Sequence, residues 1–513
     1  APLPALRNAM AYLLLTGGTG LLGAYLVRDL LKAGRNLALV VRSTRKEPAL
    51  ARVESLMARW EEVDGREYPR PIVLAGDLTE DNLGLDASSR RWVARNCDSV
   101  MHNAASLTFQ ATGPNDEPWR SNLHGTRRVL DLCREAGIRE FHHVSTAYVC
   151  GLRQGRILES ELDAGQTHGN DYEVSKFRAE LMVRDSDFLD KPTFYRPSII
   201  LGDSKTGYTS TFYGFYVPLK LVSSLLNKAA GVATNREELV ASIRDSGQRL
   251  TEILNLPDHA GKNYVPVDWV SAVMAQIAMN PQHYGKTYHL TPDAPVKLKL
   301  TREATEQACA NYTELAEQRT YCEAERLDFE KFFTEGMKVY AAYWRDDPFF
   351  DTTNTRAAAP QLPCPDMDIP FFLRICQFAF DTRFGRRLST APARVEFDIH
   401  EKMQQWITQV NTPKQERKSA YVGLRVDGAG GGQWELSLSN GRLISIDQGI
   451  TDRCTATFHL NSRTFAALAS DRTTAQQAFE TGDVRIQGNG VPASTLVRVL
   501  EEAAAGTHGV PAQ

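Results

Sequence analysis

The chain has 513 residues, of which 42% are hydrophobic and 24% charged, and this indicates a globular protein with two or three full-sized domains. Its formal net charge of −3 gives no sign of nucleic-acid binding, and no apolar run is long enough to span a membrane. The eight cysteines are scattered and form no C-x-x-C pair, which speaks against a zinc site or a redox motif and indicates reduced thiols in a cytoplasmic protein.

The first strong pattern is a glycine-rich turn between an apolar strand and an amphipathic helix, within residues 12–30. Gly17 permits a sharp turn, Gly20 lets the backbone approach a pyrophosphate, and Gly23 lets the helix pack closely on the strand. The helix N-terminus offers unpaired N–H groups to phosphates. Glycines also mark ordinary turns, so the prediction depends on the elements that follow. The cofactor contacts expected here are Thr16, Gly17, Thr19, Gly20, Leu21, Leu22 and Gly23.

A second strand is predicted at residues 36–41. In dinucleotide-binding folds, the residue that follows this strand selects between NAD and NADP. An acidic residue at this position accepts hydrogen bonds from the ribose of NAD, whereas an arginine pairs with the 2′-phosphate of NADP. Arg42 stands here, followed by Ser43, and Arg45 and Lys46 add positive charge. The sequence therefore predicts NADPH, although a solvated basic loop would show the same residues.

Strands and helices alternate over the first 150 residues, with further strands expected at residues 71–75, 99–101 and 141–145. This order predicts an α/β fold of the Rossmann type, a doubly wound parallel sheet with its ligand at the carboxyl ends of the strands. A helix is expected from Asn122 to Leu132. The residues that follow two of the strands are predicted to meet the nucleoside, namely Asp77, Leu78, Asn103, Ala104 and Ala105.

A predicted helix beginning near residue 171 carries Tyr172 and Lys176, which stand one turn apart on one face. The ammonium of Lys176 is expected to lower the pKa of Tyr172, which makes the phenol a proton donor to a carbonyl oxygen that receives hydride. Thr146, at the end of a predicted strand, supplies a second hydrogen bond to that oxygen. A Tyr/Lys pair alone is common on helix surfaces, but here it follows the glycine turn and two suitable strand ends in order.

Residues from about 11 to 350 resemble the extended short-chain dehydrogenase/reductase family, most closely fatty acyl-CoA reductases and the thioester reductase domains of carboxylic acid reductases and peptide synthetases. The resemblance is carried by LLLTGGTGLLG, LVVRS, HNAA, NLHGTRRVLDL, FHHVSTAYVCG, YEVSK, FYRPSIILGDSKTG and YVPVDWVSAVM. It implies a catalytic set of Thr146, Tyr172 and Lys176, in which Thr146 matches the family spacing and Ser145 is one step off. It also implies cofactor contacts from Ser43, Arg45, Asn122, Tyr172, Lys176, Pro197 and Ile199, the last two near the nicotinamide.

The segments after residue 202 carry fewer motifs. Residues 209–226 are aromatic and aliphatic, which fits either protein core or an apolar substrate channel. Residues 264–268 are expected to return to the sheet, and residues 287–290 to form its last strand. Residues 302–344 look helical, and residues 346–368 have the composition of a linker.

The C-terminal part has an α+β pattern. Alternating strands are expected around residues 434–438 and 443–446, joined by an Asn440-Gly441 hairpin turn, and again at 454–460 and 483–488. Ser462 is expected to cap a short helix, and another helix is expected near residues 496–500. This order resembles the sterol carrier protein domains, which implies a lipid-sized cavity. A purely structural or dimerising domain is the alternative.

We therefore divide the chain into a reductase domain, residues 1–375, with a smaller substrate lobe from about 205–260 and 300–350, and a sterol carrier protein-like domain, residues 376–513. The expected function is the NADPH-dependent reduction of a lipophilic acyl thioester, presented by CoA or a carrier protein, to an aldehyde or an alcohol. A ketone reductase or alcohol dehydrogenase acting on a hydrophobic ring-containing metabolite would use the same residues. A non-catalytic dinucleotide sensor or lipid-binding protein is the third hypothesis.

Overall fold

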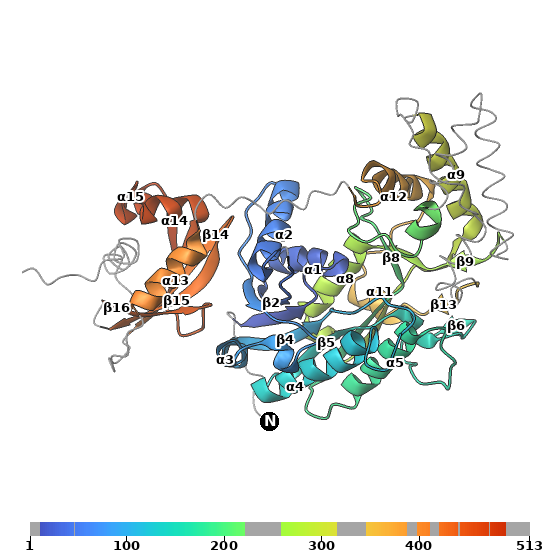
Figure 1. The fold of residues 1–513 in the computed structure, drawn as a ribbon, viewed down its shortest axis with the longest axis horizontal. Coiled ribbons are helices and arrows are strands. Elements are labelled where there is room, and N and C mark those ends of the chain that lie inside the picture. The colour runs from blue at the N-terminus through green and yellow to red at the C-terminus, as the bar shows by residue number, and fades with distance from the viewer. Residues whose placement is uncertain are drawn as a thin grey trace, which may run out of the picture.

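The protein is built around one large parallel sheet (Figure 1). The computed structural model describes residues 11–45, 47–220, 258–314, 345–386, 398–410, 420–439, 442–470 and 472–488. Seven strands lie in the order β11-β7-β5-β4-β1-β2-β3, and every neighbouring pair is parallel. They are β1 (Tyr12–Thr16), β2 (Asn36–Val41), β3 (Ile72–Ala75), β4 (Cys97–His102), β5 (Glu140–Val144), β7 (Thr193–Pro197) and β11 (Thr287–Leu290). The strand order reverses between β1 and β4, so the predicted Rossmann-type sheet is confirmed.

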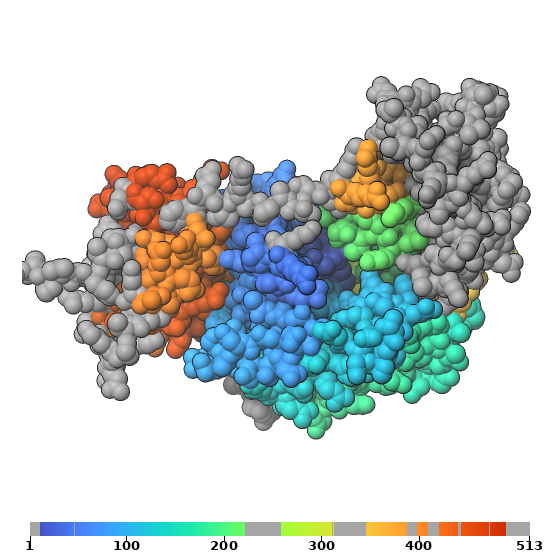
Figure 2. Space-filling view, viewed as in Figure 1, coloured from blue at the N-terminus to red at the C-terminus, as the bar shows by residue number. Residues whose placement is uncertain are grey.

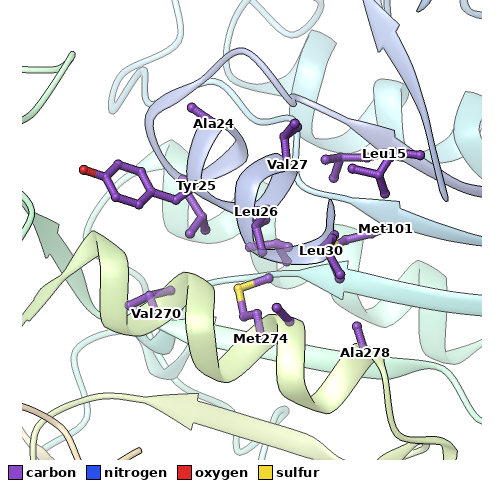
Figure 3. Close-up of a cluster of buried hydrophobic side chains, with 14 of the residues drawn as sticks. Leu15, Ala24, Tyr25, Leu26, Val27, Leu30, Met101, Val270, Met274 and Ala278 are labelled. Carbon is purple, nitrogen blue, oxygen red and sulfur yellow. The ribbon is translucent and has the colours of Figure 1, made fainter. Parts of the chain in front are cut away.

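Helices cover both faces of this sheet, which explains why β1 reads as an unbroken apolar run (Figure 1). One face carries α1 (Leu21–Lys32), α2 (Ala49–Asp64) and α8 (Val267–Ala278). The other carries α3 (Ala87–Asn96), α4 (Thr126–Ala136) and α5 (Asp171–Arg184). Figure 3 shows how Leu26 and Leu30 of α1 meet Met274 of α8 in the first of these two cores.

Short elements connect the large ones. The helix expected to open at Asn122 begins earlier, as a π-helical segment, η2 (Trp119–Gly125), which continues into α4. The 3-10 segments are η1 (Asp81–Gly84), η3 (Ala147–Cys150) and η4 (Pro281–His283). No helix in the described part of the chain is both long enough and apolar enough to cross a membrane.

A second group of elements forms a lobe beside the carboxyl edge of the sheet. It contains three two-stranded pairings, β8 (Ile199–Leu201) with β10 (Tyr264–Pro266), β9 (Gly261–Lys262) with β12 (Val296–Lys297), and β6 (Arg156–Ile157) with β13 (Phe349–Phe350). Its helices are α9 (Leu298–Glu314) and α12 (Ile369–Asp381), whereas α11 (Thr353–Ala358) packs against β11 and α8. Its core is aromatic, with Phe215, Tyr264 and Phe372 in mutual contact.

Three expectations for this lobe are corrected by the structure. Residues 264–266 do not return to the large sheet but pair with β8 in a separate small sheet. Residues 346–368 are not a linker, because β13 and α11 lie inside them and Phe350 is buried. The boundary expected after residue 375 falls inside α12, which packs against α9, so we place it after Asp381. Residues 221–257 and 315–344 of the predicted lobe lie outside the described residues.

The C-terminal part is a separate α+β unit with its own core. Its sheet has the order β16-β15-β14-β17-β18, in which only the β14–β17 pair is parallel. The elements are α13 (Ile399–Val410), β14 (Ala420–Asp427), β15 (Gly432–Ser439), β16 (Arg442–Gln448), β17 (Ala456–Asn461), α14 (Ser462–Ala469), α15 (Ala475–Glu480) and β18 (Val484–Gly488).

Most of the C-terminal strands lie where the alternation placed them, but one cap differs. Asn461, not Ser462, caps α14, because its Oδ1 accepts a hydrogen bond from the Thr464 N–H at 2.9 Å. Helices α13 and α15 and strand β14 were not predicted from the sequence. The Asn440-Gly441 turn and the helix near residues 496–500 lie outside the described residues.

The C-terminal unit, orange and red in Figure 2, packs against the blue N-terminal part of the chain, and its hydrogen bonds reach the amino end of β1. The Tyr12 hydroxyl, at the start of β1, donates to Gln433 Oε1 at 2.7 Å and accepts from the Ile450 N–H at 3.0 Å. Glu54 Oε2 accepts from the Gly430 N–H at 2.9 Å, and the Trp92 indole donates to the Gln448 carbonyl. In these contacts each polar group of one domain is hydrogen-bonded to a group of the other, so the interface fixes one orientation of the two domains.

Candidate active site

A cavity of about 700 Å³ opens at the carboxyl ends of the parallel strands, where the strand order reverses. This is the place at which open α/β sheets bind ligands. Sixteen of the predicted site residues line it, namely Gly17, Thr19, Gly20, Leu21, Leu22, Arg42, Asp77, Leu78, Asn103, Ala104, Ala105, Thr146, Tyr172, Lys176, Pro197 and Ile199. Residues that lie up to 182 positions apart in the sequence, Gly17 and Ile199 being the most distant pair, therefore line one cavity.

The glycine turn is shaped by close contacts that no larger residue permits. Gly17 has a φ of +73°, and a Cβ there would lie 2.7 Å from the backbone of Ala104 on the neighbouring strand end. A Cβ on Gly23 would lie 1.9 Å from the Gly17 carbonyl oxygen. At Gly20 the nearest such contact is 3.4 Å away, so this glycine leaves open space that faces the cavity. The turn thus has two packing glycines and one that leaves room for a ligand.

Five predicted contacts do not line the cavity. Thr16 is buried and hydrogen-bonds His102 Nδ1 at 2.8 Å. Asn122 accepts from the Ser106 N–H at 2.7 Å and donates to Ser175 Oγ at 2.9 Å. It therefore supports the cavity wall without lining the cavity. The others are Gly23, Ser43 and the exposed Arg45, and Lys46 lies outside the described residues.

The predicted catalytic set meets at the cavity wall. Asn170 Oδ1 accepts from the Glu173 N–H at 2.9 Å and so caps α5, which places Tyr172 and Lys176 one turn apart near its start. Lys176 Nζ donates to the Val144 carbonyl at 2.6 Å. Thr146 follows β5, and its side chain hydrogen-bonds Tyr172. The three side chains thus come from one helix and one strand end that pack on each other.

The expectation that Lys176 lowers the pKa of Tyr172 is wrong. Burial raises the pKa of Tyr172 to about 12, and the hydrogen bond from Thr146 offsets only part of this effect. Burial also lowers the pKa of Lys176 to about 8, against the attraction of Glu180. The ammonium is bound to the Val144 carbonyl, and desolvation dominates for both groups. Tyr172 is thus held as a neutral phenol, which is the form that donates a proton.

A second basic residue stands beside Arg42, and the sequence analysis missed it. Arg52 of α2 lines the cavity and donates to the Arg42 carbonyl at 2.6 Å and to Thr19 Oγ1 at 2.9 Å. Arg42 Nη1 lies 3.7 Å from Asp77 Oδ2 and its side chain is 65% exposed. Two guanidinium groups therefore flank the end of β2, which is the region that faces the adenosine part of a dinucleotide. No local sequence pattern marked Arg52, because its partner Thr19 lies 33 positions away.

Residues 209–226 were expected to form either core or an apolar substrate channel, and the part that the structure describes, residues 209–220, contributes to both the core and the cavity wall; a substrate channel stays a prediction. Tyr216 and Leu219 are buried core residues. Tyr213, Phe215 and Pro218 line the cavity, and they make one wall of it apolar. Residues 221–226 lie outside the described residues.

Comparison with known proteins gives the family. Residues 15–274 match the male sterility protein family of NAD-binding domains. The chain belongs to the male sterility protein family. The expected assignment to oxidoreductases of the short-chain dehydrogenase/reductase type is confirmed, and with it a nicotinamide cofactor. The matched residues contain the whole predicted catalytic set and every predicted cofactor contact.

Curated relatives are similar to this chain over part of their own length. The nonribosomal peptide synthetase asaC of Aspergillus flavus is 23% identical over 293 residues, which are 55% of this chain and 26% of that protein. The fatty acyl-CoA reductase wat of Drosophila melanogaster is 25% identical over 321 residues, 55% of this chain and 57% of that protein. The chain thus spans less than two thirds of either relative.

One solved structure and a second family model also match parts of the chain. The terminal R domain from the myxalamid PKS-NRPS biosynthetic pathway superposes with a TM-score of 0.57 at 23% identity, covering 76% of this chain and 94% of that one. This likeness shows a shared fold. Residues 396–506 match the alkyl sulfatase C-terminal family. The resemblance to sterol carrier proteins stays a prediction.

Proposed function

We propose that the protein reduces a lipophilic acyl thioester with NADPH, to an aldehyde or an alcohol. The observation that carries this proposal is that Tyr172, Thr146 and Lys176 line the same cavity as the Gly17–Gly20 turn, with an apolar wall beside them. A proton donor, a dinucleotide-binding turn and a pocket for an oily chain are the three parts that such a reduction requires.

The described residues fit a dinucleotide. The space at Gly20 admits a pyrophosphate, which the N-terminus of α1 would bind through its N–H groups and dipole. Lys176 would hold the nicotinamide ribose, and Pro197 and Ile199 would lie beside the ring. When bound, the nicotinamide supplies a hydride to the carbonyl carbon of the substrate.

The chain's own residues handle the oxygen and its proton. Tyr172 and Thr146 hydrogen-bond the carbonyl oxygen and stabilise its developing negative charge, and Tyr172 then gives its proton to that oxygen. The positive charge of Lys176 compensates the phenolate that remains. Breaking the carbon–sulfur bond then releases a thiol and leaves an aldehyde, which a second round of the same chemistry takes to an alcohol.

For the cofactor we propose NADPH rather than NADH. Arg42 and Arg52 place two positive charges where a 2′-phosphate would lie, and Arg42 is exposed enough to turn from Asp77 to a phosphate. Binding titrations are expected to show NADPH ahead of NADH, with the gap narrowed in Arg42→Ala and in Arg52→Ala. Equal affinities in the unmutated protein would refute this choice.

The substrate is expected to arrive as a thioester of CoA or of a carrier protein, since relatives include a nonribosomal peptide synthetase and a fatty acyl-CoA reductase. The deciding experiment follows NADPH oxidation and free-thiol release with acyl-CoA substrates of several lengths and with an acylated carrier protein. Thiol release in step with NADPH oxidation supports the proposal. Absence of thiol release with every substrate removes it, and turnover of a hydrophobic ketone instead establishes the ketone reductase alternative.

For the C-terminal domain we propose binding of a lipophilic ligand, on the strength of its resemblance to sterol carrier proteins and its apolar core. Titration of the protein with a fluorescent fatty acid tests this. Saturable binding that persists in the presence of excess NADPH supports a separate lipid site, and lack of binding leaves the domain with a structural role.

A further inference from the structure

A buried hydroxyl in the cavity wall has no hydrogen-bond partner among the described residues. It belongs to Ser198, which lines the cavity and is 7% exposed. The backbone N–H of the same residue is paired, since it donates to the Leu290 carbonyl at 3.1 Å. Burying a hydroxyl without a partner costs free energy that an alanine at this position would avoid. An unpaired hydroxyl in the wall of a ligand cavity therefore indicates a partner on the ligand.

Ser198 differs in this respect from the other buried polar groups that lack a partner in the described part of the chain. Most of them, His143 and Thr291 included, belong to residues that do not line the cavity. Ser145 does line it, but its side chain interacts with the buried Glu180 carboxylate. Within the described residues, Ser198 alone combines a place in the wall with a hydroxyl that has no partner in the protein.

The topology of the sheet puts Ser198 in the nicotinamide half of the cavity. A dinucleotide crosses such a sheet where the strand order reverses, with its pyrophosphate at the turn that follows β1. Arg42 and Asp77 follow β2 and β3 and mark the adenosine side, so the nicotinamide would lie over the ends of β4, β5 and β7. Ser198 directly follows β7. The Thr146 hydroxyl donates to the Pro197 carbonyl at 3.4 Å, so the peptide that leads into Ser198 lies beside the predicted catalytic set.

The cofactor is a better partner for this hydroxyl than the substrate carbonyl. A carbonyl oxygen has two lone pairs, and Tyr172 and Thr146 occupy both in the proposed reaction. The nicotinamide ring has one hydrogen-bonding substituent, which is its carboxamide. Pro197 and Ile199 would flank the ring with apolar side chains only, and residue 198 lies between them. Ser198 is thus placed to supply the polar contact that its two neighbours do not.

We propose that the Ser198 hydroxyl hydrogen-bonds the carboxamide of the nicotinamide ring. This inference rests on the proposed NADPH site and adds a cofactor-binding residue to it. The bond forms only when the cofactor is bound. Ser198 therefore contributes to the affinity for NADPH and adds no hydrogen bond to the protein without it.

The experiment measures Kd without substrate, for NADPH and for 2′-phospho-ADP-ribose, which is NADPH without its nicotinamide. Ser198→Ala is expected to raise the Kd for NADPH about fivefold, the size of one net hydrogen bond. The Kd for 2′-phospho-ADP-ribose should stay the same. The 3-acetylpyridine analogue of NADPH keeps the carbonyl oxygen and lacks the amide nitrogen. An unchanged penalty with this analogue assigns the bond to the oxygen, and its loss assigns the bond to the nitrogen.

Urea unfolding without ligand separates cofactor binding from a structural role. Ser198→Ala loses no bond within the protein, so its free energy of unfolding should be no lower than that of the native protein. Ser204→Ala is the matched control, because the Ser204 hydroxyl donates to Asp268 Oδ2 at 2.6 Å and does not line the cavity. This control should be less stable and bind NADPH with unchanged Kd. With saturating NADPH, the gain in stability should be smaller for Ser198→Ala than for Ser204→Ala.

Three results would overturn the assignment of Ser198. They are an unchanged Kd for NADPH in Ser198→Ala, an equal loss of affinity for NADPH and 2′-phospho-ADP-ribose, and a loss of stability without ligand. Slower thiol release at an unchanged Kd would give the hydroxyl to the substrate instead. None of these results bears on the reductase function, because the native protein would still release thiol. Conversely, native protein that releases no thiol removes the reductase function and leaves the NADPH titrations interpretable.

Discussion

The two ends of β1 are built in opposite ways. At the carboxyl end the chain passes from Thr16 to Gly17, and the turn that follows leaves a hollow in front of Gly20. At the amino end the Tyr12 side chain is fully buried and its hydroxyl makes two hydrogen bonds to the C-terminal domain. The strand between them is uniformly apolar and buried. The carboxyl end of β1 is therefore open because Gly20 has no side chain. The amino end is closed by the large Tyr12 side chain, whose hydroxyl is fully hydrogen-bonded.

This contrast separates residues that take part in catalysis or cofactor binding from residues that stabilise the fold. Groups around the open end should change catalysis or cofactor affinity when they are altered, with small effects on folding. Groups around the closed end should change stability and leave turnover as it is. The predictions below test this separation.

Tyr172→Phe carries the largest expected effect. Loss of the general acid is expected to lower kcat for thiol release about 100-fold or more, since proton donation typically contributes this much. Steady-state kinetics with an acyl-CoA measures it, and urea unfolding should show little change in stability. Tyr12→Phe is the matched control at the other end of β1 and should keep kcat. Undiminished turnover by Tyr172→Phe contradicts the catalytic assignment.

Gly23→Ala and Gly20→Ala should differ although they lie in one turn. The new Cβ at position 23 would overlap the Gly17 carbonyl, so the backbone must shift, and we expect a loss of about 3 kcal/mol in the free energy of unfolding. Gly20→Ala meets no close atom and should keep its stability within about 0.5 kcal/mol while binding NADPH more weakly. Denaturant unfolding and NADPH titration measure both. Equal stability of the two variants would contradict the packing role of Gly23.

Tyr12→Phe tests the closed end by itself. It removes the donor to Gln433 and the acceptor of the Ile450 N–H, and leaves both partners buried without their bond. We expect the free energy of unfolding to fall by about 1–3 kcal/mol with kcat unchanged. Urea unfolding and the thiol-release assay measure the two quantities. A change in kcat as large as the one expected for Tyr172→Phe would break the comparison.

The smallest expected effect concerns pH and Lys176. Its pKa in the folded protein is about 8, below the ordinary value of 10.5, so the unfolded chain holds more protons between these values and stability rises with pH. Relative to Lys176→Met, the native protein should gain about 1 kcal/mol between pH 8 and pH 9. Parallel urea unfolding of the two proteins at these pH values measures the gain. If the difference in the free energy of unfolding between the two proteins is the same at pH 8 and pH 9, the pKa of Lys176 does not lie near 8.

The sequence was most informative where a residue's role follows from its local pattern. The alternation of apolar strands with amphipathic helices, the three glycines, and the spacing of Tyr172 and Lys176 were sufficient to predict the sheet and to place the predicted catalytic set at one cavity. Position along the chain also singled out Arg42, because it follows directly after a strand. These signals are all local, and the fold brings them together by a rule common to parallel sheets.

The missed features depend on contacts between distant segments. Arg52 meets Thr19 across 33 positions, and Lys262 meets Asp347 across 85, so neither pairing leaves a mark in the local pattern. The pKa of Tyr172 was predicted with the wrong sign because the depth of its burial outweighs its helical neighbour. Residues 346–368 have the composition of a linker, but Phe350 is buried and converts the segment into part of the lobe.

The docking of the C-terminal domain determines how far its ligands would lie from the cavity. Tyr12 and Thr16 stand about 13 Å apart along one strand, at four rises of about 3.3 Å each. If the C-terminal domain binds a lipophilic ligand as proposed, its docking at Tyr12 holds that ligand near the amino ends of the strands, opposite the cavity. Passage of such a ligand to the cavity would then require its release into solvent or a separation of the two domains.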